Sequence, residues 1–141
     1  MDIQAFNEVP PAVNQIEINP CYQQEESIAF MRENSVQAEA WAPFAEGRNN
    51  LFQNEELLAI AGRHGKSVGQ VVLRWLLQRS VVSLAKSVRR ERMAENLAIF
   101  DFELDDSDMA RIAKLETAAS SFFSHRDAAT VKWMSERRLD V

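Results

Sequence analysis

The stretch GKSVGQVVLRWLLQRSVVSLAKS, residues 65–87, decides the fold of this 141-residue chain. Within it, Ser67 and Gln70 have the spacing of a capping box, in which each side chain satisfies a backbone N–H of the other residue. The box predicts a helix over 68–79, and because apolar residues cover most of its circumference, we expect it to be buried. An apolar strand over 81–86 follows at once, so the stretch joins a buried helix to a buried strand.

Two more strands lie upstream of this stretch. Residues 11–19 (PAVNQIEIN) alternate in polarity and stop before Pro20, a residue that terminates strands. An amphipathic helical stretch follows, and its apolar residues are Ile28, Ala29 and Met31. The second strand covers 36–42 (VQAEAWA) and runs into Pro43. The chain therefore repeats the order strand, then helix.

An additional helix is predicted over 54–64, between the second strand and the quoted stretch. Asn54 has the position of an N-cap, and Gly65 that of the glycine that ends a helix in the left-handed conformation. The first turn of this helix is acidic and its last turn is basic, which complements the helix dipole at both ends.

Two helices are predicted after the third strand. One lies near 90–99 and the other over 106–116, capped by Asp105 or Asp106. The residues expected to face inward are Met93, Ala94 and Leu97 in the first helix and Met109, Ile112 and Leu115 in the second. Beyond them the pattern weakens into a tail, 117–141, with a short helical piece around 131–137.

Strands that alternate with helices imply a parallel sheet, so the fold class is α/β. Three parallel strands cannot close a barrel, and they leave two open edges. We therefore expect the chain to pair with another chain, to rearrange, or to be part of something longer.

Composition limits the function classes. The net charge of −5 argues against general nucleic-acid binding, which usually requires a basic excess. The single cysteine, Cys21, excludes an internal disulfide and fits a reducing compartment, so we expect a cytoplasmic protein. The start of the chain does not have the pattern of a secretory signal, and no apolar run approaches the roughly 20 residues that span a bilayer.

The carboxyl ends of the strands are where α/β folds bind ligands. At the third strand end, the run 86–92 (KSVRRER) combines several cations and the hydroxyl of Ser87 with a helix N-terminus, which together suit a phosphate group. A solvated basic helix start is the alternative interpretation. At the second strand end, Trp41 is either a stacking platform for a flat ligand or a core aromatic. The amide of Gln15, within the first strand, needs a partner that is either a ligand or backbone.

Other reactive residue types show no useful pattern. His64 and His125 have no nucleophile and carboxylate at a meaningful spacing, so we interpret both as surface histidines. Cys21 has no cations near it in sequence and is interpreted as a structural thiol. The chain has no metal-ligand spacing and no glycine-rich phosphate loop.

Taken together, the segments resemble the aldo-keto reductase superfamily. The resemblance rests on five stretches, which are PAVNQIEINP at 11–20, AWAPF at 40–44, GKSVGQVVLRWLLQRSVVSLAKS at 65–87, RRERMAENLAIFDFELDDSDMARI at 89–112 and FFSHRDAATVKW at 122–133. It implies a partial (β/α)8 TIM barrel, a single partial domain over 1–141 that supplies the last three strand–helix units. The helices at 54–64 and 106–116 resemble the family's two additional helices, and the tail resembles its C-terminal substrate loop. A tail that only covers apolar surface is the alternative interpretation.

The resemblance also implies an NADPH-dependent reduction of a carbonyl to an alcohol by hydride transfer. Gln15 then corresponds to the glutamine that holds the nicotinamide carboxamide, and Trp41 to the aromatic that stacks on the ring, with Ala42, Pro43 and Phe44 completing that segment. The residues that match the grip on the 2′-phosphate are Lys86, Ser87, Val88 and Arg92, and those that match the adenine contacts are Glu95 and Asn96. Fixed cations around a dianionic phosphate favour NADP over NAD.

Some positions depart from the family. Ala42 replaces a frequent serine, Ala85 a frequent proline, and Ser80 a common glycine. The family's catalytic aspartate, tyrosine, lysine and histidine lie on earlier strands, and no residue of this chain corresponds to them. Tyr22 follows the wrong strand for the general acid, so we assign no catalytic residue.

Three hypotheses remain. The first is a reductase fragment that keeps its cofactor-binding elements and is inactive alone, whether a natural truncated product, a designed piece or part of a longer chain. The second is a non-catalytic module that assembles with itself or with a partner, because its strand edges and barrel-facing side need covering. The third is a chain that becomes catalytic when an N-terminal portion completes it. We expect no nucleic-acid or membrane partner.

Overall fold

The computed structural model describes residues 5–124 and 126–138. His125, interpreted above as a surface histidine, lies outside them. The elements, in chain order, are β1 (Val13–Glu17), α2 (Glu25–Glu33), β2 (Gln37–Trp41), the 3-10 segment η1 (Ala45–Gln53), α3 (Glu55–His64), α4 (Val68–Gln78), β3 (Val82–Ser83), α5 (Arg90–Leu97), α6 (Asp106–Ala113) and α7 (Ala128–Glu136).

The three strands form one parallel sheet in the order β1-β2-β3. Gln15 pairs with Glu39, and Ala40 pairs with Ser83, so the carboxyl ends of all three strands meet at one edge of the sheet. The predicted parallel α/β arrangement is confirmed. The third strand is shorter than the expected 81–86, because β3 has no second neighbour within the described residues and only Leu84 N continues the ladder, to Ala40 O at 3.1 Å.

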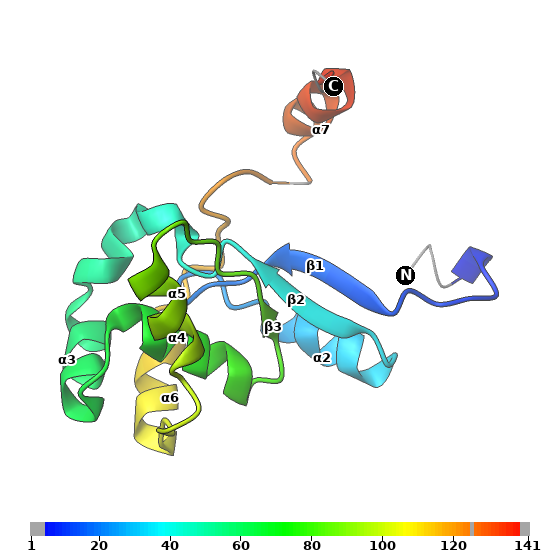
Figure 1. Ribbon diagram of the computed structural model, residues 1–141. Coiled ribbons are helices and arrows are strands. Elements are labelled where there is room, and N and C mark those ends of the chain that lie inside the picture. The colour runs from blue at the N-terminus through cyan, green and yellow to red at the C-terminus, as the bar shows by residue number, and fades with distance from the viewer. Residues whose placement is uncertain (1–4, 125, 139–141) are drawn as a thin grey trace.

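One face of the sheet is covered by helices and the other is largely open. Ala38 and Ala40 are buried in one cluster with residues of α2 and α4, and these two helices lie on the same side of the sheet (Figure 1). On the opposite face, Val13, Val82 and Leu84 are each close to half exposed. Buried parallel sheets normally have both faces covered. The open face is therefore the side on which a complete barrel would be closed.

Local sequence signals position the helices that were expected to be well capped. The Asn54 side chain accepts hydrogen bonds from the backbone N–H groups of Glu56 and Leu57, both at 3.1 Å, and Gly65 has a φ of 62°. The Ser67–Gln70 capping box is formed in both directions. These contacts confirm the predicted boundaries of α3 and α4 within one or two residues.

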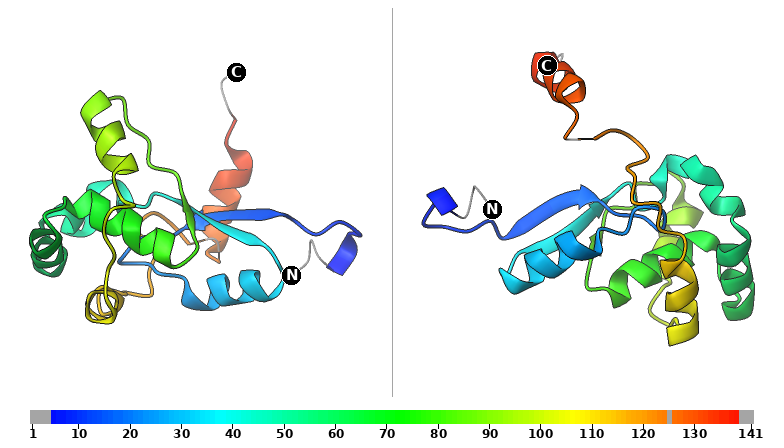
Figure 2. Two further views of the ribbon diagram at one scale, coloured as in Figure 1. Left: turned by 60° about the horizontal axis from the view of Figure 1, so that its bottom comes forward. Right: turned by 180° about the vertical axis from the view of Figure 1, so that it is seen from behind.

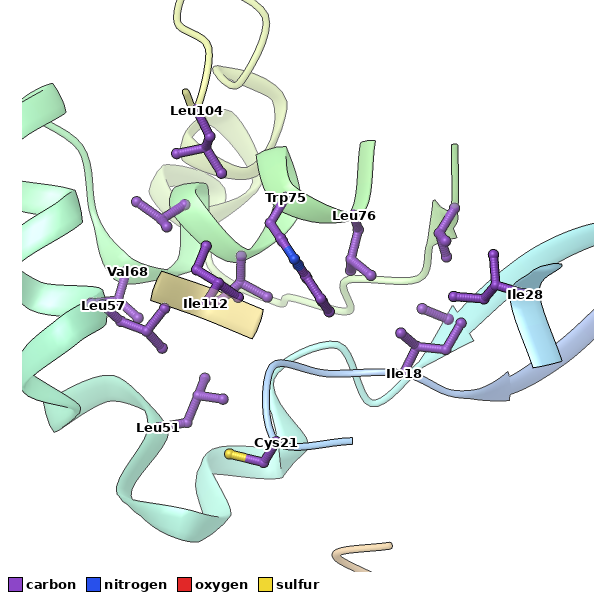
Figure 3. Packing of buried hydrophobic residues seen from close by; sticks show 14 of the residues in the cluster. Ile18, Cys21, Ile28, Leu51, Leu57, Val68, Trp75, Leu76, Leu104 and Ile112 are labelled. Atoms are coloured by element: carbon purple, nitrogen blue, oxygen red, sulfur yellow. The ribbon is translucent and has the colours of Figure 1, made fainter. Parts of the chain in front are cut away.

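The core lies between the covered sheet face and the helices. Figure 3 shows Trp75 in the middle of the cluster, with Leu57 and Ile112 on one side of it and Leu76 and Ile18 on the other. All five side chains are at most 1% exposed. Fully burying one large apolar side chain contributes about 1.5–3 kcal/mol, so this cluster dominates the stability of the fold.

The helix after β3 differs from its prediction. Met93 and Leu97 are 49% and 71% exposed, and no residue of α5 is buried, so the expectation that Met93, Ala94 and Leu97 face inward is wrong. The Gln70 side chain holds the end of α5, through the backbone oxygens of Glu95 and Ala98 at 3.2 and 2.9 Å. These polar contacts reach only the end of the helix. Met93 and Leu97 face an open hollow that Leu73 of α4 also lines, so the apolar side of α5 is only partly covered by the described residues.

The other helical predictions agree more closely. Ile28 and Met31 of α2 are buried, although Ala29 is exposed. In α6, Ile112 is fully buried and Asp105 forms the expected N-cap.

The tail crosses the strand ends to the open side of the sheet, where α7 stands away from the helical layer (Figure 2). No described helix is long and apolar enough to cross a membrane.

Candidate cofactor-binding site

The end of β3 presents a basic, uncapped helix start. Ser87 Oγ accepts a hydrogen bond from Arg89 N at 3.1 Å, which turns the chain into α5 at Arg90. The N-cap residue, Arg89, makes no side-chain cap, so the first backbone N–H groups of α5 remain available. An eight-residue helix of this kind carries a partial positive charge at its N-terminus, where an anion is stabilised.

The cations at this helix start are unpaired. Lys86, Arg89, Arg90 and Arg92 are all exposed, and no acidic side chain of the described residues forms an ion pair with them. Val88 is 81% exposed and lies between them. Lys66, Arg79 and Arg111 have carboxylate partners, whereas the exposed Arg32 has none in the described part of the chain, so the start of α5 differs in gathering four unpaired cations at one helix N-terminus. The donor set at the start of α5 therefore suits a dianionic phosphate that comes from outside the chain.

The two predicted adenine-contacting residues lie further along α5. Glu95 is exposed, and its backbone oxygen is used by Gln70. Asn96 is partly buried and lines an open hollow of about 270 Å³ together with Ser83, Ala85 and Met93. Their side chains lie on the same element as Arg92, one turn away, as an extended ligand on α5 would require.

The end of β2 is covered by the tail. The Trp41 ring lies 5.0 Å from the Phe122 ring, tilted by 55°, and 6.1 Å from the Phe123 ring, nearly parallel at 20°. These are the ordinary distances of interacting aromatic rings. Trp41 is thus only partly buried, and its flat surface is in contact with rings of its own chain.

The segment after Trp41 turns sharply. Ala42 has a φ of 49°, in the left-handed region, so the serine found in many family members would also be held in this unusual conformation here. Pro43 is buried, and the Phe44 ring packs on the core and lies 5.7 Å from the Phe52 ring. Of the predicted segment, Pro43 and Phe44 thus support the loop. Trp41 and Ala42 are partly exposed, and Trp41 is in contact with Phe122 and Phe123 of the tail.

Gln15 points to the open face and has a partner there. Its amide donates to a carboxylate oxygen of Glu39, its register partner on β2. The sequence left open whether the amide of Gln15 binds a ligand or backbone, and in the structure its partner is a side chain of the neighbouring strand. A nicotinamide carboxamide that bound Gln15 would have to share or replace this bond.

Two features of the strand ends were missed by sequence reasoning. Glu17 is only 5% exposed, and its carboxylate accepts hydrogen bonds from Ser120 Oγ and from Ser121 N, the latter at 3.1 Å. Arg48 and Asn49 reach the same tail residue, Ser121. A carboxylate inside an otherwise alternating strand was the available signal for Glu17, whereas nothing local indicated that residues a hundred positions away would bind it.

The interpretation of His64 as a surface histidine is wrong, because its side chain is largely buried and pairs with a buried carboxylate. His64 Nε2 lies 2.8 Å from Asp108 Oδ2, and Arg63 also pairs with this fully buried carboxylate. Burial opposes the ionisation of Asp108, but the hydrogen bonds from His64 and Arg63 outweigh it and hold its pKa below the ordinary value. Burial raises the pKa of the Cys21 thiol, despite a hydrogen bond with Asn49 that lowers it, which agrees with a structural thiol.

No cluster of three or more His, Cys, Asp or Glu side chains suited to a metal occurs among residues 5–124 and 126–138. The end of β2 carries an aromatic ring, and the neighbouring end of β3 carries cations without carboxylate partners among these residues, which suit an anion. This combination fits a ligand with a flat ring at one end and a phosphate at the other.

Comparison with known proteins agrees with this geometry. The profile of the Aldo/keto reductase family matches residues 1–117. Glyoxal reductase of Bacillus subtilis is 45% identical over 108 residues, which are 77% of this chain and 38% of that protein. Morphine 6-dehydrogenase of Pseudomonas putida is 36% identical over 140 residues, which cover 92% of this chain and 47% of that protein.

Solved structures agree as well. An aldo-keto reductase of the silkworm Bombyx mori, crystallised with NADPH, is 36% identical and superposes with a TM-score of 0.79 over 85% of this chain and 39% of its own. The chain belongs to the aldo/keto reductase family, and its three strands with their helices are a partial barrel. It spans less than half the length of the curated relatives it matches.

Proposed function

We propose that this chain binds NADPH along the carboxyl ends of β2 and β3 and serves an oxidoreductase that reduces a carbonyl to an alcohol. The observation that carries the proposal is the unpaired basic start of α5. Lys86 and Arg92 hold the 2′-phosphate together with the Ser87 hydroxyl and the backbone at Val88, while Trp41 receives the nicotinamide ring. NADPH, when bound, supplies the hydride.

The related structures support the cofactor, because neighbours with TM-scores of 0.76 and 0.79 were crystallised with NADPH. The roles of Gln15, Ala42, Pro43, Phe44, Glu95 and Asn96 remain predictions that follow from the family resemblance. We also propose a cytoplasmic location, on the ground of composition. The tail from 117 onward is proposed to contribute to the pocket of a small carbonyl substrate.

We assign no catalytic residue in this chain. The proposal is therefore that it binds the cofactor and does not oxidise NADPH in the presence of a carbonyl unless a polypeptide that carries the family's acid–base residues completes it. Mixing the chain with such an N-terminal portion, and following NADPH absorbance with and without a carbonyl, tests this. A chain that turns over alone would contradict the assignment.

The cofactor proposal is tested by titration with NADPH and NADH, followed by tryptophan fluorescence and by calorimetry. We expect NADPH to bind more tightly than NADH. Arg92→Ala should weaken NADPH binding about 10- to 100-fold, the effect of losing a charge-assisted bond of about 1.5–3 kcal/mol, and leave NADH unchanged. Arg32→Ala, an exposed arginine in the last turn of α2, is the matched control and should change neither.

Equal binding of NADPH and NADH, or equal loss in both arginine variants, would mean that the start of α5 is not a phosphate site. No binding of either cofactor by a folded chain would favour a second candidate function, a non-catalytic module that assembles with itself or with a partner. The half-exposed Val13, Val82 and Leu84 on the open sheet face support that candidate. Light scattering over a range of concentrations distinguishes the two, since a monomer at all concentrations contradicts self-assembly.

A further inference from the structure

The tail segment 120–123 is built onto the strand ends by a specific set of contacts. Ser120 Oγ accepts hydrogen bonds from Phe122 N and Phe123 N, both at 3.1 Å, so the serine fixes the backbone that carries both rings. The rings are then presented to Trp41 at 5.0 and 6.1 Å. The segment is thus a small preformed unit that carries two aromatic rings to the end of β2.

Glu17 is the anchor of this segment. Its carboxylate is buried, no cation of the described residues pairs with it, and its donors are Asn19 Nδ2 at 3.2 Å, Ser120 Oγ and Ser121 N. A buried carboxylate requires hydrogen-bond donors, and here the tail provides two of them. If the tail moves away from the strand ends, Glu17 becomes accessible to water, and water molecules replace the two donors of the tail. The carboxylate therefore has hydrogen-bond donors whether the tail is bound to it or not.

The loop after β2 makes a second set of contacts that keep segment 120–123 in place. Arg48 donates to Ser121 O and lies with its guanidinium 4.4 Å above the Phe122 ring, and Asn49 Nδ2 donates to Ser121 Oγ at 2.8 Å. Within residues 42–50 this loop carries five non-glycine residues in the left-handed conformation. Such residues cost about 1–3 kcal/mol each and persist only where their surroundings hold them. The docked tail is part of those surroundings.

We propose that segment 120–123 is an intramolecular competitor for Trp41, which a ring-shaped ligand must displace before it can stack there. The inference rests on the proposed function, because it takes the nicotinamide ring as that ligand. Phe123 already lies nearly parallel to the indole, which is the arrangement that a stacked nicotinamide would adopt. Glu17 is a positioning residue in this scheme, since it holds the competitor and does not touch the ligand.

Competition has a measurable signature. The apparent affinity for a ligand is reduced by the fraction of molecules whose site is free, so holding the tail on Trp41 weakens only ligands that need the indole. NADPH carries the nicotinamide ring, whereas adenosine 2′,5′-bisphosphate has the 2′-phosphate without it. Release of the tail should tighten NADPH binding and leave the bisphosphate unaffected.

The experiment compares the full chain with a Phe122→Ala, Phe123→Ala double variant by calorimetry with both ligands. We expect the double variant to bind NADPH about tenfold more tightly, since two aromatic contacts are lost, and to bind adenosine 2′,5′-bisphosphate equally. Phe100→Ala, which removes a 66% exposed phenylalanine at another place, is the control and should change neither affinity. Circular dichroism checks that all chains are folded.

Hydrogen exchange gives a second measurement on the unaltered chain. Saturation with NADPH should speed the exchange of the amides of residues 122 and 123, whereas the bisphosphate should leave their protection in place. Equal NADPH affinity in all chains, weaker binding by the double variant, or slower exchange of these amides with NADPH would overturn the competition. No binding of either ligand to any chain would overturn the proposed function, and the competition with it.

Discussion

The ends of β2 and β3 lie next to each other in one sheet but are surrounded very differently. At β2, the indole of Trp41 is covered by Phe122 and Phe123, and the following loop is held by Arg48 and Asn49. At β3, Lys86 and Arg92 are exposed and have no partner in the part of the chain that the structure describes. The β2 half of the candidate site is covered by residues of the chain itself, and the β3 half is exposed to solvent.

Physical chemistry explains the difference. A solvated cation is stable in water, so the start of α5 can remain empty without cost to the fold. Exposing the apolar surface of an indole to water is unfavourable, so a nearby apolar segment tends to cover it. The tail therefore covers the indole of Trp41, while the solvated cations at the start of α5 stay exposed.

The largest expected effect comes from the support that both strand ends share. Trp75 is 1% exposed in α4, which packs on β3 and shares a buried cluster with Ala40 of β2, and Arg79 lies 4.4 Å above its ring. Trp75→Ala should lower the free energy of unfolding by about 3–5 kcal/mol, measured by denaturant titration, and disturb both ends together. The matched control is Trp133→Ala, at a tryptophan in α7 that is 56% exposed, which should change stability by less than about 0.5 kcal/mol. Similar losses in the two variants would contradict the assigned core.

An intermediate effect is expected at the contact between α3 and α6. This contact is buried, as the end of β2 is, and it contains charged side chains, as the end of β3 does. Asp108 is held ionised by His64 and Arg63, with its pKa below the ordinary value of about 3.9. A carboxyl whose pKa is lowered by folding stabilises the fold above its unfolded pKa, and this contribution is lost as the pH falls through the folded pKa. The free energy of unfolding should therefore decrease as the pH is lowered from about 5 to about 3.

Asp108→Asn tests the assignment of that pH dependence. The variant should be about 1–3 kcal/mol less stable at neutral pH, because Arg63 and His64 lose a charged partner, and its stability should change less between pH values of about 5 and 3. Glu103→Gln is the control, because Glu103 is exposed and forms no ion pair with any described residue, so the change should leave the pH dependence as it is. An Asp108→Asn chain with the full pH dependence would mean that other carboxylates cause it.

The smallest expected effect compares two serines that each organise a turn at one strand end. Ser120 Oγ accepts from two backbone N–H groups and donates to buried Glu17. Ser87 Oγ accepts from Arg89 N at 3.1 Å and donates only a long bond of 3.4 Å to Arg89 O, at an exposed turn. Ser120→Ala should cost about 1 kcal/mol and speed hydrogen exchange in the tail, and Ser87→Ala should cost less than about 0.5 kcal/mol. The opposite order would mean that the β3 end, and not the β2 end, is the more firmly built.

Local sequence signals were sufficient wherever neighbouring residues interact with each other. The Asn54 cap, the Ser67–Gln70 capping box and the left-handed Gly65 were all predicted and are all formed. The parallel order of the strands followed from the alternation of strands and helices and is confirmed. The inward face predicted for α5 was wrong, because periodicity identifies an apolar side but does not say whether another element covers it.

The sequence by itself therefore determined the capped helices, the parallel three-stranded sheet, the basic start of α5 and the membership of a family that the comparisons then showed. Tertiary structure alone decided that Glu17 binds Ser120, that Phe122 and Phe123 cover Trp41, and that Gln15 meets Glu39. The first set depends on contacts within a few residues and on hydrophobic periodicity. The second depends on contacts between strands or across about a hundred positions, which exist only once the sheet has brought its strand ends together.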